Sequence, residues 1–333
     1  MILSYDTINM KPPYDITPLI LQLVSSISLK LGAVQARNIE KHSPLLRKHN
    51  RIKTIHGSLQ IEGNTLTEEQ VTALIENKRV IGPGKDIKEV MNAVAVYKNL
   101  PGYRSTAEKS FLAAHKILMT GLAAKPGKYR ASGVGIVKGS QVTHLAPPAD
   151  KVPGLMKDLF EYLKKTDELV LITSCVFHYE TEFIHPFLDG NGRMGRLWQT
   201  LILMEHYPVF EYLPFETLIS KTQKKYYTAL SKADKAGKST GFIEYMLTVI
   251  DESLGDMLAL RNPVMTESDR VEYYLSLNKN EFTRKDYMQV FKDMSTATAS
   301  RDLKNAVHQK KIIKTGTYNK TRYSPVKVEP ARR

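Results

Sequence analysis

The sequence predicts a mainly α-helical protein with one β-hairpin and a small separate domain at its C-terminal end. Apolar residues recur at helical spacing in successive segments up to about residue 260. One region among them, around residues 134–145, has two short β-prone runs on either side of a turn that contains glycine. From about residue 265 the chain becomes basic: the last 69 residues carry 15 Lys and Arg against 8 Asp and Glu, half of the net charge of +14.

The expected elements follow one another between glycine, proline and polar breaks. Residues 1 to about 15, with Pro12-Pro13, are expected to be extended. Helices before the hairpin are expected at 17–41, 43–61, 67–78, 85–99 and 106–121. Helices after it are expected at 151–165, 168–184, 192–206, 215–236 and 240–260. Thr65-Leu-Thr67-Glu-Glu predicts a helix start, because acidic residues are favoured at the positive end of the helix dipole.

Composition limits the protein class. The 333 residues suffice for one sizeable domain and a smaller one, and 42% hydrophobic residues can form a real core. We find no stretch approaching ~18 uncharged apolar residues, and the N-terminus lacks the pattern of a signal peptide. The single cysteine, Cys175, excludes an internal disulfide and is expected to be buried and inert. These features predict a soluble, cytoplasmic protein without a membrane partner.

The most informative run is His185-Pro-Phe-Leu-Asp-Gly-Asn-Gly-Arg-Met-Gly-Arg196. Gly190-Asn191-Gly192 lies where a turn leads into an apolar helix, and exposed backbone N–H groups at such a place bind phosphate. Arg193 and Arg196 are three residues apart, so both can project from one face of the first turn and grip oxyanions. Asp189, just before the turn, is suited to Mg²⁺ that bridges phosphate oxygens. His185, with an ordinary pKa near ~6.5, is suited to accept a proton from an attacking hydroxyl.

This run resembles, without a mismatch, the signature HPFx[D/E]GN[G/K]RxxR of the Fic family, and His178 and Phe183 upstream also resemble that family. Fic proteins are mostly protein AMP-transferases with an all-helical core, and the resemblance covers about residues 45–250. It implies that His185 deprotonates a Ser, Thr or Tyr hydroxyl of a target protein, or of the chain itself, which then attacks the α-phosphate of ATP. Gly192 argues against the family variant with Lys at this position, which phosphorylates instead.

The resemblance also implies a role for each residue of the run. Asp189 would carry Mg²⁺, and Arg196 would hold the γ-phosphate. The α- and β-phosphates would be held by Gly190, Asn191, Gly192 and Arg193, and Gly195 is assigned to the same phosphate site.

A second run, Ser58-Leu-Gln-Ile-Glu62-Gly63-Asn64, is a helix end, since Gly63 is a good C-terminal stop. It resembles the [S/T]xxxE[G/N] inhibitory motif of many Fic proteins. The resemblance implies that Glu62 pairs with Arg196 and occupies the γ-phosphate site, so that ATP enters with its α-phosphate badly angled for attack. In some relatives the same Glu is thought to orient water for removal of AMP, which leaves a reverse activity open. Family members with this arrangement are often homodimers.

The hairpin region, about 130–148, resembles the Fic flap, which registers a target chain by strand addition. Val142, Thr143 and His144 are expected nearest to the nucleotide. Residues 226–234 resemble the helix that borders the adenine, although the family often has Asn where this chain has Asp234. Tyr226 and Tyr227 fit adenine contact and helix packing equally well.

Two other patterns carry no site. Ala236-Gly-Lys-Ser239 looks like the end of a phosphate-binding loop, but Lys232 stands where the leading Gly is needed and no strand precedes it. His178, Glu182 and His185 share helical spacing, but no HExxH motif or Cys cluster supports a transition metal. Structural roles are therefore expected for His178 and Glu182.

The basic tail predicts a winged helix. A short helix at Arg270–Leu277, a second from Thr283 and a third opening at Ser295 precede a basic hairpin. On the third helix Leu303 and Val307 are expected to face inward. The residues expected to face outward or to meet phosphates are Ser300, Arg301, Lys304, Lys314, Lys320 and Arg322. Winged helices also dock proteins, so a DNA partner and a protein partner stay open.

Three domains and one leading hypothesis result. The domains are an N-terminal helical region, 1–100, with the inhibitory helix at about 43–62; a Fic-type core, 101–260; and the winged-helix-like domain, 265–333. The leading hypothesis is an autoinhibited AMP-transferase that uses ATP and Mg²⁺. One rival is a DNA-binding transcriptional regulator whose core only senses nucleotide. Another is a transferase that uses a different donor, such as UTP or CDP-choline.

Overall fold

The computed structural model describes residues 11–36, 44–133, 135–138, 141–259, 267–277, 280–291, 294–317 and 320–326. These residues form two compact units. The first is built from residues 11–36 and 47–259, and the second from residues 44–46 and the described residues after 266. Each unit is described by itself.

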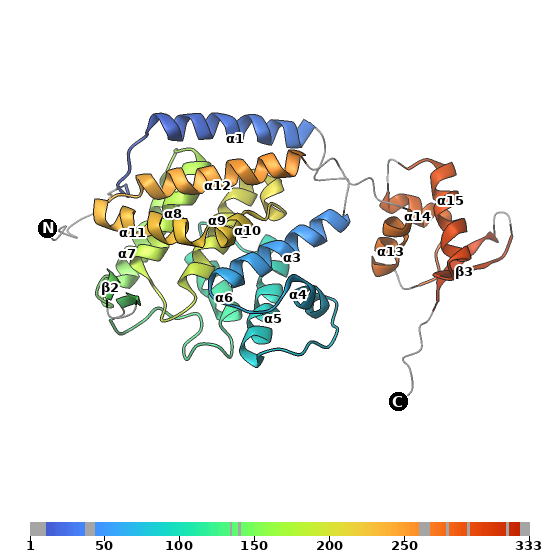
Figure 1. Ribbon diagram of the computed structural model, residues 1–333, viewed down its shortest axis with the longest axis horizontal. Coiled ribbons are helices and arrows are strands. Elements are labelled where there is room, and N and C mark those ends of the chain that lie inside the picture. Colours follow the sequence, from blue (N-terminus) through green and yellow to red (C-terminus); the bar gives the residue numbers. More distant parts are fainter. Residues whose placement is uncertain are drawn as a thin grey trace. The chain divides into compact units, whose positions relative to one another are not determined.

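The first unit is mainly helical, as the sequence predicts (Figure 1). Its elements before and including the hairpin are α1 (Pro18–Ala36), α3 (Pro44–Ile61), α4 (Glu68–Ile75), α5 (Gly84–Lys98), the short 3₁₀ helix η1 (Leu100–Gly102), α6 (Glu108–Leu118), β1 (Gly135–Lys138) and β2 (Gln141–Leu145). The later elements are α7 (Val152–Lys165), α8 (Val170–Ile184), α9 (Asn191–His206), η2 (Pro208–Glu211), α10 (Phe215–Lys221), α11 (Gln223–Ala236) and α12 (Thr240–Ala259).

Local chemistry explains where several helices begin and end. Thr67 caps α4: its side chain accepts from Gln70 N–H, and the Gln70 side chain accepts from Thr67 N–H. The single helix expected at 215–236 is wrong at Thr222, where α10 ends and α11 begins. Thr222 has φ −113° and ψ 30°, and its hydroxyl donates to Leu218 O at 2.7 Å. No glycine or proline marks this break in the sequence.

The hairpin is antiparallel, with Gly135 opposite Leu145 and Lys138 opposite Gln141. A bulge lies between Ile136 and Val137. Residues 139–140, which the sequence predicts as its turn, lie outside the described residues.

Helices α8 and α9 lie at the centre of the first unit and contribute to two hydrophobic clusters (Figure 1). One cluster packs them against α3 to α7, around Phe111 and the only tryptophan, Trp198. The other packs them against α1 and α10 to α12, around Cys175 and Phe242. Cys175 is fully buried, and burial raises the pKa of its thiol to about 12, which makes it inert.

Helix α1 is long and apolar enough to cross a membrane by length and composition alone, although it contains Lys30. In the structure it packs along α12. Ile20 and Ile27 are buried against this helix, and Lys30 forms an ion pair with Asp251 at 2.8 Å. Polar anchors and a buried stripe are typical of a helix that belongs to a globular core.

The second unit has three helices followed by a hairpin, in the predicted order. They are α13 (Glu267–Leu277), α14 (Arg284–Val290), α15 (Thr296–His308), β3 (Ile312–Thr315) and β4 (Arg322–Pro325). Its small core surrounds Tyr287 and Leu303, and Arg270 pairs with buried Asp302 at 2.6 Å. The winged-helix interpretation itself stays a prediction.

The surface residues expected on the second unit vary in exposure. Arg301 and Lys304 are exposed, as are Lys314 and Lys320. The other two, Ser300 and Arg322, contact neighbouring side chains. Ser300 accepts a hydrogen bond from Arg284 Nη1 at 2.8 Å, and Arg322 lies 3.7 Å from Glu281. Leu303 and Val307, expected to face inward, are respectively buried in the core of this unit and partly buried against it.

Candidate active site

The run from His185 to Arg196 forms the turn between α8 and α9. His185 ends α8 in the left-handed region, with φ 51° and ψ 58°, and Pro186 prevents the helix from continuing. Gly190 precedes the first residue of α9. It has φ 87°, in the left-handed region that glycine adopts without strain. Asn191 closes the turn: its side chain accepts from Phe187 N–H and donates to Phe187 O, both at 2.9 Å. The N–H groups of the first turn of α9 are thereby held in place.

Asn191 therefore takes part in the expected phosphate site only through its backbone, because its side chain is committed to the turn. It is 2% exposed. A helix N-terminus with its orphan N–H groups remains a suitable place for an anion.

The half-buried His185 is held by a residue for which the sequence suggested no role, Arg130. Arg130 Nε donates to His185 O at 2.8 Å, and Nη2 donates to Ile184 O at 3.2 Å. The same Nη2 donates to Pro147 O at 2.5 Å, just after β2, and Nη1 donates to Ser132 O at 3.1 Å. One buried guanidinium thus joins the C-terminal end of α8, the strained His185 and both ends of the hairpin region.

Asp189 offers one carboxylate at the rim of the turn. Its Oδ1 accepts from Gly190 N–H at 2.6 Å and from Arg193 Nη2 at 3.0 Å, and its side chain is 54% exposed. Among the described residues no group of three or more His, Cys, Asp or Glu could hold a metal ion. One accessible carboxylate fits Mg²⁺ that brings its other ligands with it, as phosphate oxygens and water.

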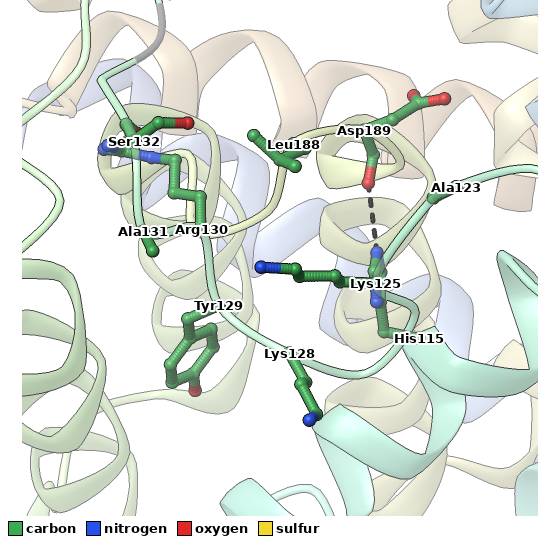
Figure 2. Close-up of a pocket in the computed structure, with 10 residues that line it drawn as sticks. All are labelled: His115, Ala123, Lys125, Lys128, Tyr129, Arg130, Ala131, Ser132, Leu188 and Asp189. Carbon is green, nitrogen blue, oxygen red and sulfur yellow. Dashed lines mark hydrogen bonds between the residues drawn. The ribbon is translucent and has the colours of Figure 1, made fainter.

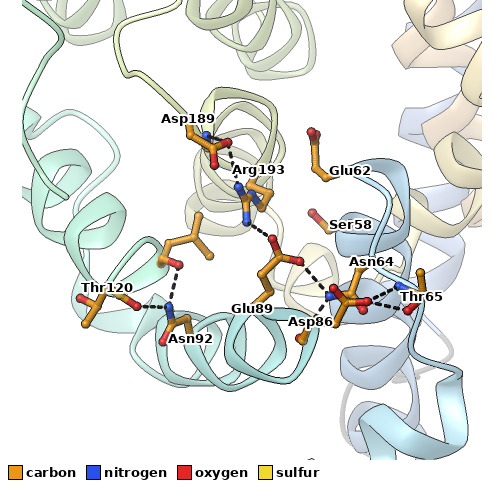
Figure 3. A network of polar contacts seen from close by, with 12 residues as sticks. Ser58, Glu62, Asn64, Thr65, Asp86, Glu89, Asn92, Thr120, Asp189 and Arg193 are labelled. Atoms are coloured by element: carbon orange, nitrogen blue, oxygen red, sulfur yellow. Dashed lines mark hydrogen bonds and ion pairs between the residues drawn. The ribbon is translucent and has the colours of Figure 1, made fainter. Parts of the chain in front are cut away.

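Arg193 lies at the centre of a polar network that runs from the signature turn to the end of α3 (Figure 3). Besides Asp189, it contacts buried Glu89 of α5, with Nη1 3.2 Å from Oε1. Glu89 in turn accepts from Asn64 Nδ2 at 2.8 Å. Arg193 Nε is buried and has no hydrogen-bond partner in the described part of the chain. Asn64, expected in the inhibitory motif, is thus linked to the phosphate-binding run through the side chain of Glu89.

Arg196 is fully buried and faces the end of α3. Its Nη2 forms an ion pair with Glu62 Oε1 at 2.7 Å and donates to Ser58 O at 3.0 Å, while Nε donates to Ser58 Oγ at 3.2 Å. Arg193 and Arg196, expected to point together at a phosphate, therefore each contact a carboxylate on a different helix. Arg196 Nη1 remains buried without a hydrogen-bond partner among the described residues.

Two glycines of the run differ in their surroundings. A Cβ at Gly192 would overlap Glu62 Oε1 and lie 3.1 Å from Arg196 Nη1, so the missing side chain leaves a space beside Arg196 that the Glu62 carboxylate fills. A Cβ at Gly195 would lie 2.6 Å from the His178 ring. Gly195, expected at the phosphate site, thus serves the close packing of α9 on α8.

The helix that carries Glu62 is seated firmly. Ile55 and Leu59 are buried in the core, and a Cβ at Gly57 would lie 2.9 Å from Thr217 N. Gly63 has φ 90° and ends the helix, as the sequence predicts.

A second carboxyl near Arg196 is Glu216, which, unlike Glu62, is fully buried. Its Oε1 accepts from Thr200 Oγ1 at 3.2 Å, and its Oε2 has no hydrogen-bond partner within the described residues. Burial raises the pKa of Glu216 to about 8, although Arg196 acts against this. Glu216 is therefore mainly protonated at neutral pH and leaves the charge of Arg196 to Glu62.

His178 and Tyr226 belong to a buried network, which favours the packing interpretation of Tyr226. His178 Nδ1 contacts Gln199 Oε1 at 2.7 Å and Nε2 contacts Tyr226 Oη at 3.0 Å. Tyr226 donates to Glu182 Oε1 at 3.0 Å. Burial alone would raise the pKa of Glu182, but His178, His185 and Arg196 hold it below its ordinary value.

The remaining predicted residues lie around this centre. Tyr227 is 43% exposed, and its hydroxyl donates to Ile61 O at 3.4 Å, next to Glu62. Asp234 accepts from Tyr179 Oη at 2.9 Å. Val142, Thr143 and His144 are on β2, but their side chains lie outside the described part of the structure.

The residues that sequence reasoning missed are Arg130, Glu89 and Glu216. Each is a buried ionisable residue, and each contacts groups that are distant in sequence. Glu89 and Glu216 lie in segments with apolar helical spacing. An acidic residue on a helix face that is expected to be buried was therefore the one signal in the sequence that could have identified them.

Comparison with known proteins gives consistent matches. The sequence model of the Fic/DOC family matches residues 105–203. The protein adenylyltransferase Fic of Nematostella vectensis is 28% identical over 219 residues, which are 62% of this chain and 48% of that protein. The protein adenylyltransferase fic-1 of Caenorhabditis elegans is 28% identical over 222 residues, 62% of this chain and 41% of that protein. The chain thus spans about half the length of the curated relatives it matches.

One crystal structure is similar over nearly the whole chain. It is that of a Fic family protein from Desulfovibrio desulfuricans G20, with 41% sequence identity and a TM-score of 0.74. The match covers 96% of this chain and 100% of that one.

Proposed function

The chain belongs to the Fic/DOC family, as the run His185–Arg196 predicts, and on that premise we propose that it is an autoinhibited protein adenylyltransferase. It moves AMP from ATP to a Ser, Thr or Tyr hydroxyl of a target protein, and its own chain is one candidate target. The observation that carries the proposal is Arg196: a buried guanidinium beside Gly192, with one N–H unpartnered among the described residues and another held by Glu62.

The phosphate-binding part of the proposal follows from charge and space. The first turn of α9 presents N–H groups, Gly192 leaves room for oxygens, and Arg193 and Arg196 supply positive charge. Each arginine also has one buried nitrogen without a partner in the described residues, so a phosphate would gain hydrogen bonds without breaking all the present ones. Mg²⁺, held by Asp189, would neutralise phosphate charge.

The transfer step assigns a proton acceptor to His185. The target hydroxyl gives its proton to the imidazole, its oxygen bonds to the α-phosphorus of ATP, and the bond to the β-phosphate breaks, releasing pyrophosphate. Arg130 positions His185 by binding its carbonyl oxygen, so the imidazole is presented from a fixed, left-handed backbone.

Inhibition rests on competition for one guanidinium. Glu62 Oε1 accepts a hydrogen bond from Arg196 Nη2. The same oxygen lies so close to Gly192 that any side chain at that position would collide with it. A γ-phosphate that binds Arg196 has to displace this carboxylate. As long as Glu62 stays, ATP is bound with its outer phosphate misplaced and its α-phosphate turned from the line of attack.

Label transfer from α-³²P-ATP to the chain itself or to lysate proteins tests the proposal. Glu62→Gly should raise labelling strongly, and Glu62→Gln, which keeps the size but removes the charge, should raise it less. His185→Ala should abolish labelling and leave ATP binding largely intact. Absence of label in every Glu62 form would refute the transferase, and lost ATP binding in His185→Ala would make His185 structural.

The same assay separates the rival functions. If another α-labelled nucleotide labels the protein and outcompetes ATP, that nucleotide and not ATP is the donor. Loss of label during a chase in wild type but not in Glu62→Gly would support AMP removal as a second activity.

The exposed Arg301, Lys304, Lys314 and Lys320 favour DNA as a second, independent partner of the C-terminal unit. Binding to duplex DNA that weakens steeply with salt would support it. Binding that is equal with all four changed to Glu would contradict it.

A further inference from the structure

A small pocket lies beside the signature turn, on the side of Asp189 and Leu188 (Figure 2). Its volume is about 170 Å³. The opposite wall is the segment from Ala123 to Ser132, which contributes Lys125, Lys128 and Tyr129. Neither the family signature nor the inhibitory motif assigns a ligand to this second wall.

The pocket is preorganised, because His115 joins its two walls. Gly127 N–H donates to His115 Nδ1 at 2.8 Å, so Nε2 carries the proton and donates to Asp189 O at 3.0 Å. The His115 ring stacks on Phe187, with ring centroids 3.5 Å apart. Arg130 N–H adds a bond to Pro186 O at 2.9 Å. Both walls therefore keep their spacing without a ligand.

The charge of the pocket is positive. Lys125 and Lys128 are exposed, and in the described part of the chain neither ammonium group has an ion-pair partner. Figure 2 shows the Lys125 side chain extending from its loop across the pocket. The one carboxylate at the edge, Asp189, already has Arg193 as its partner at 3.0 Å. An anion that enters meets two cations whose charge is not compensated.

The size and place of the pocket restrict its occupant. Sites for drug-sized ligands measure about 300–1,000 Å³, so this pocket is too small for a nucleotide and suits a single side chain. Leu188, half exposed, and Tyr129 offer apolar contact to the methylene groups of such a side chain. Arg130, which lines the pocket, donates a hydrogen bond to the backbone carbonyl of His185. The pocket is therefore next to the residue whose imidazole is expected to meet the target hydroxyl.

We propose that this pocket binds an Asp or Glu side chain of the target protein, close in sequence to the modified hydroxyl, through the ammonium groups of Lys125 and Lys128. The proposal rests on the proposed transferase function and names a determinant of its target choice. Acidic targets are drawn to the site by charge, and the pocket fixes their register beside His185.

Peptide labelling in the Glu62→Gly background tests this. Each peptide has one hydroxyl and a Glu, Gln or Lys placed one to four residues from it. Glu peptides should be labelled with a kcat/KM about 3- to 10-fold above that of matched Gln peptides, and the difference should shrink at high salt. With Lys125→Glu and Lys128→Glu the preference should reverse towards Lys peptides. Lys157→Glu with Lys164→Glu, two residues of α7 outside the pocket, makes the same change in net charge and should keep the preference for Glu.

The outcomes separate the pocket from the activity. Labelling without a charge preference, or a preference unchanged by the reversal, overturns the pocket and leaves the transferase standing. If pyrophosphate inhibits labelling, and this inhibition disappears with Lys125→Glu and Lys128→Glu, the pocket binds pyrophosphate and the proposal of an acidic side chain is overturned. If only intact proteins are labelled, mapped sites should be rich in nearby acids for Glu62→Gly and in nearby bases for the reversed form; equal compositions refute the proposal. No label on any peptide or protein refutes the transferase first.

Discussion

Acidification should destabilise the first unit through His115. This side chain is 1% exposed, and burial lowers its pKa to about 4, against an ordinary value of 6.5. The geometry agrees, because Nδ1 accepts from Gly127 N–H and a proton there would break that bond. Between pH 6.5 and about 4 the unfolded chain therefore binds a proton at His115 that the folded chain does not.

The size of the effect follows from the two pKa values. Above pH 6.5 His115 is neutral in both the folded and the unfolded chain, so the free energy of unfolding does not depend on its protonation. As the pH drops from 6.5 towards about 4, only the unfolded chain is protonated at His115, and the free energy of unfolding falls. At about 1.4 kcal/mol for each pH unit between the two, the loss attributable to His115 amounts to about 3 kcal/mol by pH 4. This is a large part of the free energy of unfolding of a typical domain.

Urea unfolding of the full chain between pH 4 and 7, followed by Trp198 fluorescence, measures this loss. Trp198 is the only tryptophan and is fully buried in the first unit, so its emission reports the unit that contains His115. His115→Gln, which keeps a donor and an acceptor but cannot titrate, should lose about 3 kcal/mol less than wild type over this range. An NMR titration of the wild-type imidazole provides a second measurement. Equal pH slopes in both proteins, together with a His115 pKa near 6.5, would refute the reasoning.

Three further perturbations follow from the site. Arg130→Lys keeps the charge but cannot reach the carbonyls together; losing charge-assisted bonds of about 1.5–3 kcal/mol each should lower both the thermal midpoint and label transfer, whereas unchanged transfer would show that His185 does not need this clamp. Burial raises the pKa of Glu216 from 4.5 to about 8, so stability is lost as the pH rises between these two values; Glu216→Gln should lose less between pH 5 and 8 in thermal unfolding, and equal losses would contradict the assignment. Gly192→Ala should destabilise wild type by crowding Glu62, but should cost at least about 1 kcal/mol less in Glu62→Gly; additive shifts of the melting temperature would exclude this coupling.

Local rules predicted most helices of the first unit, because capping residues and apolar spacing act within one or two turns. Thr67 caps α4 where the acidic run predicts a helix start. The break at Thr222 was not predictable in this way, since α10 ends and α11 begins there without a glycine or proline. It depends on tertiary packing, which places Glu216 of α10 near Arg196.

The signature run predicted the turn between α8 and α9, but not the partners of its side chains. The guanidinium of Arg130 bonds to carbonyls up to 55 residues away, and a backbone acceptor leaves no trace in a sequence. The two equal interpretations of Tyr226 could be separated only by its burial, 1% exposed, in the hydrogen-bonded network with His178. Spacing along the chain identifies candidate chemistry, whereas contacts across the core decide how it is oriented.

The seat of α3 restricts how an activator can work. Gly57 lies so close to the backbone at Thr217 that no larger residue fits, and Leu59 is 2% exposed in the core. Helix α3 is packed into the core of the first unit, so its dissociation would expose buried apolar residues to water. Activation should therefore take place within the last turn, by swinging one carboxylate aside over a few ångströms. Molecules that activate the proposed transferase are best sought among those that bind residues 60–64 from outside.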